Sequence, residues 1–456
     1  MVTIDDMARF SIEAPRYTSY PTAAEFSPAT TATDFGAALE EVGRTGEDPV
    51  ALYVHLPFCR ELCHFCGCHA LLARTPERID RYLDALSDEA RLVARILDGR
   101  RAVGELHFGG GSPSYLEADD FERLMTSLRE AFRFAAAAAI SLEADPRTTD
   151  RRKLTCYRRL GVERVSFGFQ DLDDGVQRAI GRRQSAEVSL RAFETAREVG
   201  FGGINLDLCY GLPEQTEATF LRTVSQVIAL RPDRVAIFGY AHVPWIKPLQ
   251  KLIPASSLPR AELRVRLMAS ARTALLAAGY VAIGLDHFAL PSDTLGRAAA
   301  TGTLHRNFQG YTTTKTDALV GLGLSAISDL PRGYFQNART LAGYQARART
   351  GVLATERGVL RTADDLLRGE VIRTLMCRGR LEIAAIERRF GVRFTETFAP
   401  EMADLRRLEG EGLLRLGADA IELTPLGEAF VRNVAKVFDA YRRAPAKAPH
   451  RFSMTA

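Results

Sequence analysis

Short apolar runs alternate with longer amphipathic stretches between about residue 50 and about residue 240. Six runs with the character of strands begin at Leu52, Glu105, Ile140, Arg164, Ile204 and Arg234. The amphipathic stretches between them begin near Thr75, Asp119, Asp150, Ala186 and Thr216, and several carry Thr or Asp where a helix N-cap is expected. Because this alternation indicates parallel strands joined by helices, it predicts an α/β fold, a partial (β/α)6 barrel.

Polar or glycine-rich residues lie at or just after the carboxyl end of each of these six runs. They are the cysteine-rich segment after the first run, residues 109–113, Glu143, Gln170, Asp207 with Tyr210, and Tyr240 with Ala241. In α/β barrels the catalytic groups gather at the carboxyl ends of the strands. We therefore expect an active site at this rim of the sheet.

Two further segments flank the predicted barrel. Residues 15–22 contain two prolines and two tyrosines, which favours an ordered, extended arm. From about Thr362 the sequence becomes helical and charged, and its last part predicts a helix, two short strands and a helix, as in a winged helix. We divide the chain into an N-terminal arm (1–45), the barrel with a substrate-site extension (46–345), and a smaller, mostly helical C-terminal domain (346–456).

Composition narrows the class of protein. The chain has 456 residues, of which 46% are hydrophobic and 25% charged, enough for one large and one smaller core. It contains no apolar run long enough for a membrane span and no signal-peptide pattern at its start, so we expect a cytoplasmic protein without membrane contact. A net charge of +4 is too weak to indicate nucleic acid, and the winged-helix-like tail has no dense cationic stripe, whereas a small anionic substrate suits this charge.

Four of the seven cysteines, Cys59, Cys63, Cys66 and Cys68, lie within ten residues. The CxxxCxxC spacing places three thiolates on one tight loop, where they can bind three corners of an iron–sulfur cubane and leave the fourth iron open. Ferredoxins instead fill all four corners with cysteine. A zinc site that includes His64 or His69 is an alternative, and redox-active thiols are another. We favour the open cluster.

Other residues at the rim have both a functional and a structural interpretation. Three consecutive glycines after the second run allow the backbone to approach a ligand closely, although they also suit a tight turn. Glu143 and Asp207 interrupt buried strands, where an unpaired carboxylate is costly. Glu143 therefore contacts a ligand or forms a salt bridge with Arg147 or Arg164.

The remaining candidates favour structural roles by themselves. Arg182 lies in a stretch with a helical pattern, so by itself it is predicted to be a solvated charge on the surface of a helix. Aromatic, histidine and isolated cysteine side chains of this kind are usually core or hydrogen-bonded residues; these are Tyr53, Phe65, His55, His107, His287, Cys156, Cys209 and Cys377.

Taken together, the motifs resemble one family. They are YVHLPFC, RELCHFCGCH, HFGGGSPSYL, SLEADPR, SFGFQD, NLDLCYGLPEQT, YAHVP, GLDHFA, HRNFQGYTT, GLGLSAIS, and, outside the barrel, PRYTSYPTA and RNVAKVFDAY. The sequence is similar nearly end to end to the oxygen-independent coproporphyrinogen III oxidases, which are radical S-adenosylmethionine (SAM) enzymes. It departs from them at Ser112, where Thr is frequent, and at His64, where Tyr is common. Cys68 and the arm argue against two alternatives of the same superfamily, the haem chaperones and the haem-degrading methyltransferases.

The resemblance implies a barrel of the radical SAM type with one [4Fe-4S] cluster held by Cys59, Cys63 and Cys66, while Cys68 is not a ligand. It implies a first SAM at Tyr53, Gly110, Glu143 and Ile327. It implies a second SAM at Phe65, Gly111, Ser112, Gln170, Arg182, Asp207 and Ala241.

The implied reaction converts two propionates of coproporphyrinogen III to vinyl groups and gives protoporphyrinogen IX for haem biosynthesis. An electron from the reduced cluster cleaves SAM, the 5′-deoxyadenosyl radical removes a propionate β-hydrogen, and carbon dioxide and a further electron then leave. The implied partners are coproporphyrinogen III and a reductant such as flavodoxin or ferredoxin, and we expect a monomer. Arg16 is a candidate partner for a substrate carboxylate, and we expect the arm to help close the substrate pocket.

Overall fold

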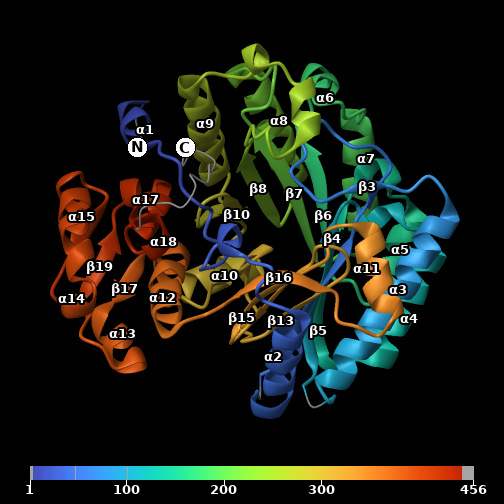
Figure 1. Cartoon of the computed structure of the whole chain (residues 1–456). Helices are drawn as coiled ribbons and strands as arrows, with labels where there is room; N and C mark the ends of the chain where they lie inside the picture. Colours follow the sequence, from blue (N-terminus) through green and yellow to red (C-terminus); the bar gives the residue numbers. More distant parts are fainter. Residues whose placement is uncertain (1–3, 47, 100, 444–456) are drawn as a thin grey trace.

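A curved sheet forms the centre of the protein (Figure 1). The computed structural model describes residues 4–46, 48–99 and 101–443. The six central strands are parallel and lie in the order β1 (Val50–Leu56), β4 (Val103–Gly110), β5 (Phe134–Ala144), β6 (Arg164–Gln170), β7 (Gly203–Tyr210) and β8 (Arg234–Gly239). Each contains one of the six apolar runs, and the sheet does not close on itself. The predicted partial (β/α)6 barrel is therefore confirmed.

Helices connect these strands and cover the outer face of the sheet (Figure 1). They are α3 (Pro76–Ile96), α4 (Ala118–Ala131), α5 (Arg151–Arg159), α6 (Asp174–Ala179), α7 (Ala186–Val199) and α8 (Glu217–Leu230). Local sequence explains where several of them begin, since the Asp150, Ser185 and Thr216 side chains accept N-terminal backbone N–H groups. Their apolar faces are buried against the strands, and the carboxyl ends of the strands remain as the exposed rim.

The sheet extends beyond the six predicted strands on both edges. Beside β1 it adds β13 (Leu319–Leu322), β14 (Ile327–Leu330), β15 (Gly333–Asn337) and β16 (Thr355–Leu360); beside β8 it adds β10 (His287–Ala289) and β9 (Val281–Ile283). The pairing of β13 with β1 is parallel, and the other added pairs are antiparallel. The remaining elements of this region are α2 (Ala32–Thr45), α9 (Ala261–Ala277), α10 (Thr294–Ala300), α11 (Leu341–Arg349), and the small pairs β2 (Phe58–Cys59) with β3 (Leu71–Leu72) and β11 (His305–Asn307) with β12 (Gly310–Thr312).

A separate C-terminal core lies to one side of the sheet, red in Figure 1. Its helices are α12 (Ala363–Arg378), α13 (Ile383–Phe390), α14 (Phe394–Thr397), α15 (Ala399–Gly410), α16 (Pro425–Ala429), α17 (Val431–Val437) and α18 (Ala440–Arg443). Its strands are β17 (Arg380–Glu382), β18 (Leu414–Leu416) and β19 (Ala420–Leu423), which pair in the order β17, β19, β18. Helices around a small three-stranded sheet agree with the winged-helix prediction.

The N-terminal segment, with α1 (Ile4–Phe10), belongs to this C-terminal core more than the sequence suggested. Phe10, Tyr17 and Tyr20 are buried within it. The Arg432 guanidinium donates to the backbone carbonyls of Ala14 and Pro15, and the Tyr17 hydroxyl donates to Asp439 over 3.0 Å. This part of the arm, which the sequence placed beside the barrel, therefore packs within the C-terminal core.

Deletion of residues 1–22 should consequently unfold the C-terminal domain. Loss of a large buried aromatic side chain costs about 3–5 kcal/mol, so three such losses approach the roughly 5–15 kcal/mol that stabilises a typical domain. Limited proteolysis and thermal melts would show rapid cleavage within residues 362–443. A control that lacks only residues 1–9 keeps all three aromatic residues and should melt near the full-length chain; equal melting of both truncations would contradict this account.

A buried polar network fixes helix α3 beneath the rim. The Glu89 carboxylate accepts hydrogen bonds from Gly323 N–H (2.7 Å), the Asn337 amide (2.6 Å) and the Tyr344 hydroxyl (2.7 Å). About two helical turns earlier in α3, the Tyr82 hydroxyl donates to the His55 carbonyl at 2.5 Å. Burial raises the pKa of Glu89 to about 7, although its three donors lower it.

This pKa predicts a pH-dependent stability. The folded state binds the Glu89 proton more tightly than the unfolded chain, so the stability gained is complete below about pH 4.5 and is lost as pH rises through about 7. Relative to Glu89→Gln, the free energy of unfolding of the wild type should fall by about 2.5 kcal/mol between pH 5 and pH 8. Urea titrations of both proteins at pH 5 and pH 8 measure these free energies of unfolding. Exposed Glu40→Gln serves as the control, and a wild type that follows Glu89→Gln at both pH values would refute the assignment.

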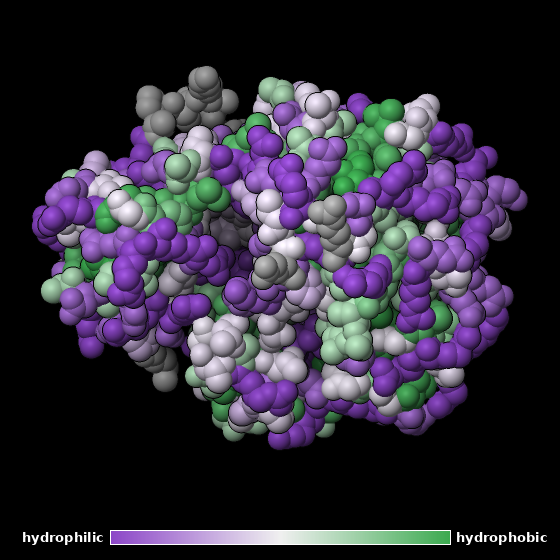
Figure 2. Space-filling view, turned by 90° about the horizontal axis from the view of Figure 1, so that it is seen from below, coloured by the Kyte–Doolittle hydropathy of each residue, from purple (hydrophilic) through white to green (hydrophobic). Residues whose placement is uncertain are grey.

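The surface agrees with the composition. Within the described residues no helix is both long and apolar enough to cross a membrane. Hydrophilic side chains dominate the face shown in Figure 2, and hydrophobic ones are interspersed among them.

Candidate active site

The cysteine-rich segment forms a loop at the carboxyl end of β1. A short parallel pairing of Phe58 with Leu71 closes the loop (residues 57–72), helped by the hydrogen bond from Leu71 N–H to the Pro57 carbonyl at 2.7 Å. A second backbone bond joins His64 N–H to the Ile180 carbonyl at 2.9 Å. We call residues 57–72 the cysteine loop. Its folding brings Cys59, Cys63 and Cys66 to the rim where the sequence predicted the site.

The thiols of this loop influence one another. Burial, together with the neighbouring Cys66 and Cys63 thiolates, raises the pKa of Cys59 to about 12. Hydrogen bonds from Cys68 lower the pKa of Cys66 to about 6, and the Cys68 N–H lies 3.3 Å from the Cys66 sulfur. The Arg182 guanidinium lies 3.5 Å from the Cys63 sulfur. Several thiolates held this close repel one another unless cations lie between them, which is what an iron cluster provides.

The chemistry of this donor set fits a cubane better than a single ion. All seven cysteines are free thiols. Across the described parts of the chain, no three His, Cys, Asp or Glu side chains gather around one point as zinc ligands do. Ligands of a cubane bind different irons and need not converge in this way.

The three glycines form a close approach between β4 and the cysteine loop. Gly111 N–H donates to the Leu56 carbonyl at 2.9 Å, and a Cβ at Gly111 would lie 2.6 Å from the Pro57 backbone. Gly110 has φ +116°, a conformation that favours glycine, and a Cβ there would meet the His55 ring at 2.6 Å. The glycines are thus required for packing: Gly109 and Gly110 are buried, and Gly111 is half-buried beside the cysteine loop.

Glu143 lies at the end of β5 facing these glycines. Its carboxylate accepts the Gly110 N–H at 3.2 Å and lies 3.4 Å from His107 Nε2. Burial alone would raise its pKa, but His107 and Gly110 hold the pKa below the usual value, so the group is ionised. Its side chain remains 44% exposed. The carboxylate therefore has free acceptor capacity toward the space above the sheet.

The sequence suggested a salt bridge from Glu143 to Arg147 or Arg164 as the alternative to a ligand contact. Among the interactions of the described residues, neither arginine binds Glu143. Arg147 binds Asp145 at 2.6 Å and Glu61 at 3.1 Å instead. Tyr53 lies on β1, next to His107 on β4. It stacks against the His107 ring and shares a 2.9 Å hydrogen bond with His55 Nδ1. The three side chains Tyr53, His107 and Glu143 form one polar cluster on β1, β4 and β5.

Arg182 corrects one prediction from the sequence. It is not a solvated helix charge, because α6 ends at Ala179 and Gly181, with φ +65°, turns the chain inward. Arg182 is only 7% exposed, donates to the Gly168 carbonyl at 2.8 Å and lies 3.5 Å from Asp145. It therefore places a buried cation between the cysteine loop and the end of β6.

Gln170 lies at the end of β6, and Asp207 lies within β7, three residues before its end. Gln170 ends β6 with φ +66°, where a bulge disturbs pairing with β7. Asp207 accepts hydrogen bonds from Ser166 and Asn205, both at 2.8 Å, and burial raises its pKa to about 6. The nearby Glu143 carboxylate contributes to the raised pKa of Asp207, so these two carboxyl groups lie close enough to interact.

The remaining predicted positions lie on the loops and strands around these residues. Phe65 packs against a small apolar cluster that includes Cys209 and Tyr240. Ser112 is buried with its hydroxyl 3.2 Å from Ser114, and the Ala241 carbonyl accepts from Gln250 at 3.2 Å. Ile327 begins β14, and its backbone abuts Gly321, the pairing partner of Tyr53.

Arg16 does not stand free for a ligand. It forms an ion pair with buried Asp286, which also binds His287 at 2.6 Å. The Arg16 side chain keeps 37% exposure, and its charge is largely balanced by this pair.

Sequence reasoning missed the loop after β8, residues 243–252, which we call the capping loop. Gln250 is 1% exposed and donates to the Phe65 carbonyl at 3.0 Å, and the Lys247 ammonium lies 3.2 Å from the Cys68 carbonyl. Both contacts join positions more than 170 residues apart. The capping loop thereby holds the cysteine loop in place.

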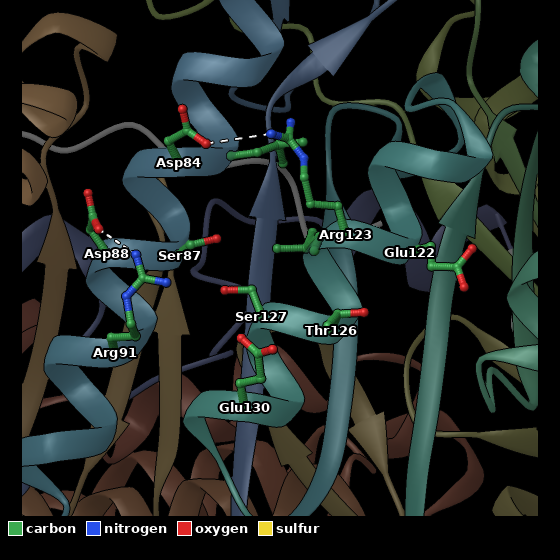
Figure 3. A pocket seen from close by; sticks show the side chains of 11 residues that line it. Asp84, Ser87, Asp88, Arg91, Glu122, Arg123, Thr126, Ser127 and Glu130 are labelled. Atoms are coloured by element: carbon green, nitrogen blue, oxygen red, sulfur yellow. Dashed lines mark hydrogen bonds and ion pairs between the residues drawn. The ribbon is translucent and has the colours of Figure 1, made fainter.

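A groove of about 460 Å³ lies elsewhere, between α3 and α4 (Figure 3). Ion pairs line it, including Arg123 with Asp84 at 3.6 Å and Arg91 with Asp88 at 2.7 Å. It lies on the outer helical layer, away from the strand ends, and both of its arginines already form ion pairs. We therefore place the site at the rim and not in this groove.

Replacing Cys68 by serine should preserve the cluster. Cys68 contacts Cys66 through its backbone N–H, which serine retains, and through its side chain, where a serine hydroxyl can also donate; an open-iron cluster needs no fourth thiolate. Anaerobically reconstituted Cys68→Ser should keep about four irons and the visible absorption of a [4Fe-4S] cluster. If this variant lost its iron as completely as Cys63→Ser, the fourth corner would be bound by protein.

Comparisons with known proteins agree with this geometry. Residues 53–227 match the radical SAM superfamily, and residues 362–430 match the HemN C-terminal domain. The chain is 42% identical over 441 residues to the oxygen-independent coproporphyrinogen III oxidase of Salmonella typhimurium, covering 96% of this chain and 95% of that protein. A protein of the same name from Synechocystis is 40% identical over 437 residues, covering 95% of this chain and 94% of that one.

A solved structure is similar over nearly the whole fold. It is the coproporphyrinogen III oxidase HemN from Escherichia coli, described as a radical SAM enzyme. The TM-score is 0.90 at 41% sequence identity, and the match covers 93% of this chain and 97% of that one. The similarity thus includes the barrel, the rim and the C-terminal domain.

Proposed function

The chain belongs to the family of oxygen-independent coproporphyrinogen III oxidases, and from this premise we propose a role for each group at the rim. The enzyme is an oxidoreductase that uses a [4Fe-4S] cluster and SAM. It converts two propionates of coproporphyrinogen III to vinyl groups and gives protoporphyrinogen IX in porphyrin biosynthesis. Each conversion removes one β-hydrogen atom, one carbon dioxide and one electron. The haem chaperone and haem-degrading methyltransferase alternatives are not favoured by these relatives.

Cys59, Cys63 and Cys66 hold the cluster, and Cys68 does not. When bound, the cluster and SAM supply the one-electron chemistry that generates a carbon radical. The observation that supports this assignment best is the closed cysteine loop, on which Cys63 and Cys66 lie near enough to Cys59 to raise its pKa, while the Arg182 guanidinium lies 3.5 Å from the Cys63 sulfur. Arg182 offsets the negative charge that three thiolates bring to a buried site.

The polar cluster beside the cysteine loop holds the first SAM. Glu143 is ionised and half-exposed, so it offers a strong acceptor to N–H or O–H groups of the cofactor. His107, on which Tyr53 stacks, and the Gly110 N–H keep its carboxylate in place. The backbone of Gly110, where no Cβ intervenes, and Ile327 complete this first subsite.

The strand ends from β6 to β8 hold a second SAM. Asp207 and Gln170 provide polar groups toward the same space, and Arg182 provides a buried cation between the two subsites. Phe65, Gly111, Ser112 and Ala241 border it.

The enzyme works as a cytoplasmic monomer that takes electrons from a small carrier such as flavodoxin or ferredoxin. We retain the division into arm (1–45), barrel (46–345) and C-terminal domain (346–456). β16, which lies in the third range, pairs with β15 of the second, so the two parts share a sheet edge.

An anaerobic assay tests the function. Reconstituted enzyme, SAM, a reductant and coproporphyrinogen III should yield protoporphyrinogen IX, detected after oxidation as the divinyl porphyrin. Each vinyl group formed should accompany 5′-deoxyadenosine. Tight haem binding without any vinyl product would instead support the chaperone alternative.

A further inference from the structure

An apolar surface covers the outside of the capping loop. Trp245, Ile246, Leu249 and Leu252 are 55%, 59%, 39% and 58% exposed. Half of the large hydrophobic residues that stand exposed in the described chain therefore fall within eight consecutive positions. Burying such side chains is favourable, so a cluster of this kind usually marks an interaction surface.

The inner side of the same loop is rigidly attached to the cysteine loop. The Gln250 side chain accepts the Val243 N–H at 2.5 Å and donates to the carbonyls of Phe65 and Ala241. Lys247 adds the contact to the Cys68 carbonyl, and Ile253, 2% exposed, packs in the same apolar cluster as Phe65. The exposed apolar surface is thus separated from the cluster-binding loop by a single layer of protein.

The charged side chains of the capping loop and of the residues next to it along the chain are all positive. Residues 241–260 contain Lys247, Lys251 and Arg260 and no Asp or Glu. Arg60, in the cysteine loop, is exposed as well. Glu61 is bound to Arg147, and Glu214 lies at the far end, where its N–H donates to the Ser257 carbonyl. An apolar centre with a cationic rim complements a partner with an apolar centre and an acidic rim.

We propose that the outer face of the capping loop is the docking surface for an acidic one-electron carrier protein that reduces the cluster. The proposal rests on the proposed function, which needs an electron at the cysteine loop. Electron transfer between proteins weakens steeply with distance, so a carrier must dock close to the centre it reduces. Encounters of this kind bury little surface, and a loop of this size is sufficient for one.

A second copy of the chain fits this surface less well. In a two-fold dimer the same patch would face itself, which sets Lys247 and Lys251 against their own counterparts. Like charges across an interface oppose association. An acidic carrier gains from the same charges, and its approach is accelerated by them at low ionic strength.

The chain offers a reporter at this surface, since Trp245 is its only tryptophan. Holoenzyme labelled with 5-fluorotryptophan should give one ¹⁹F signal. Unlabelled bacterial flavodoxin or ferredoxin, each purified and oxidised, should shift or broaden this signal, and added salt should reverse the effect. Binding is then read without any enzyme turnover.

A matched pair of variants tests the role in electron delivery. Ile246→Ser/Lys251→Glu removes apolar surface and reverses one charge in the capping loop; Val352→Ser/Lys315→Glu makes the same changes at distant exposed positions. 5′-Deoxyadenosine formation is measured with reduced flavodoxin, with reduced ferredoxin and with dithionite, a small reductant that needs no docking. With a protein carrier the first variant should be slower by about tenfold or more, whereas with dithionite both variants should equal the wild type.

Each other outcome overturns the proposal. Full activity of the capping-loop variant with both carriers would do so, as would a Trp245 signal that neither carrier changes. A signal that depends on enzyme concentration alone would assign the surface to a second copy, and one that responds only to coproporphyrinogen III would assign it to the substrate. Wild-type holoenzyme that fails to cleave SAM even with dithionite would refute the proposed function itself.

Discussion

Serine in place of Cys59, Cys63 or Cys66 should abolish both the iron–sulfur chromophore and all product formation. Each thiolate binds a different corner of the cluster, and a serine hydroxyl, with its far higher pKa, is a poor replacement for a thiolate toward iron. Activity should fall below detection, because radical formation requires the cluster. Iron and sulfide analysis with the visible spectrum measures the first effect, and the anaerobic assay measures the second.

Cys377→Ser is the matched control. This cysteine is partly buried in the distant α12 helix, so its replacement should leave about four irons and four sulfides per cluster-binding chain. Stoichiometric zinc and no iron in anaerobically purified wild type would revive the zinc alternative and reject the cluster assignment.

Glu143→Ala should separate cluster binding from SAM binding. The carboxylate is ionised and only partly satisfied by His107 and Gly110, so its removal deletes a charged hydrogen-bond acceptor from the first SAM subsite. A hydrogen bond to a charged group is worth about 1.5–3 kcal/mol, which corresponds to roughly 10- to 100-fold weaker SAM binding. Equilibrium binding of SAM to the reconstituted variant measures this loss.

Two further variants sharpen the test. Glu143→Gln keeps an acceptor without the charge and should bind SAM with intermediate affinity, while Glu122→Ala, exposed on α4, should match the wild type. All of these proteins should retain the cluster spectrum. Unchanged SAM affinity in Glu143→Ala would remove this residue from the subsite.

The strands and their rim residues were predictable because both signals are local. An apolar run with a carboxylate near its carboxyl end, such as Glu143 or Asp207, identifies both a buried strand and the polar edge of a parallel sheet. The cysteine spacing is equally local, so the loop after β1 followed from residues 59–66 alone.

Other features depend on contacts that no local pattern records. Arg182 was expected on a helix surface, but the positive φ of Gly181 ends the helical course and turns the side chain inward. The arm was expected to flank the barrel, yet Tyr17 and Tyr20 are buried in a core more than 340 residues away along the chain. Lys247 and Gln250 escaped notice for the same reason, since their partners lie in the cysteine loop.

The central claim is that the cysteine loop leaves one iron of its cluster for SAM. Pulsed electron–nuclear double resonance on the reduced holoenzyme with SAM labelled by ¹⁵N at the methionyl amine tests it most directly. The account predicts a clear ¹⁵N coupling to the cluster, present in Cys68→Ser and absent when SAM is omitted. A fully reduced cluster that shows no coupling to bound, labelled SAM would contradict it.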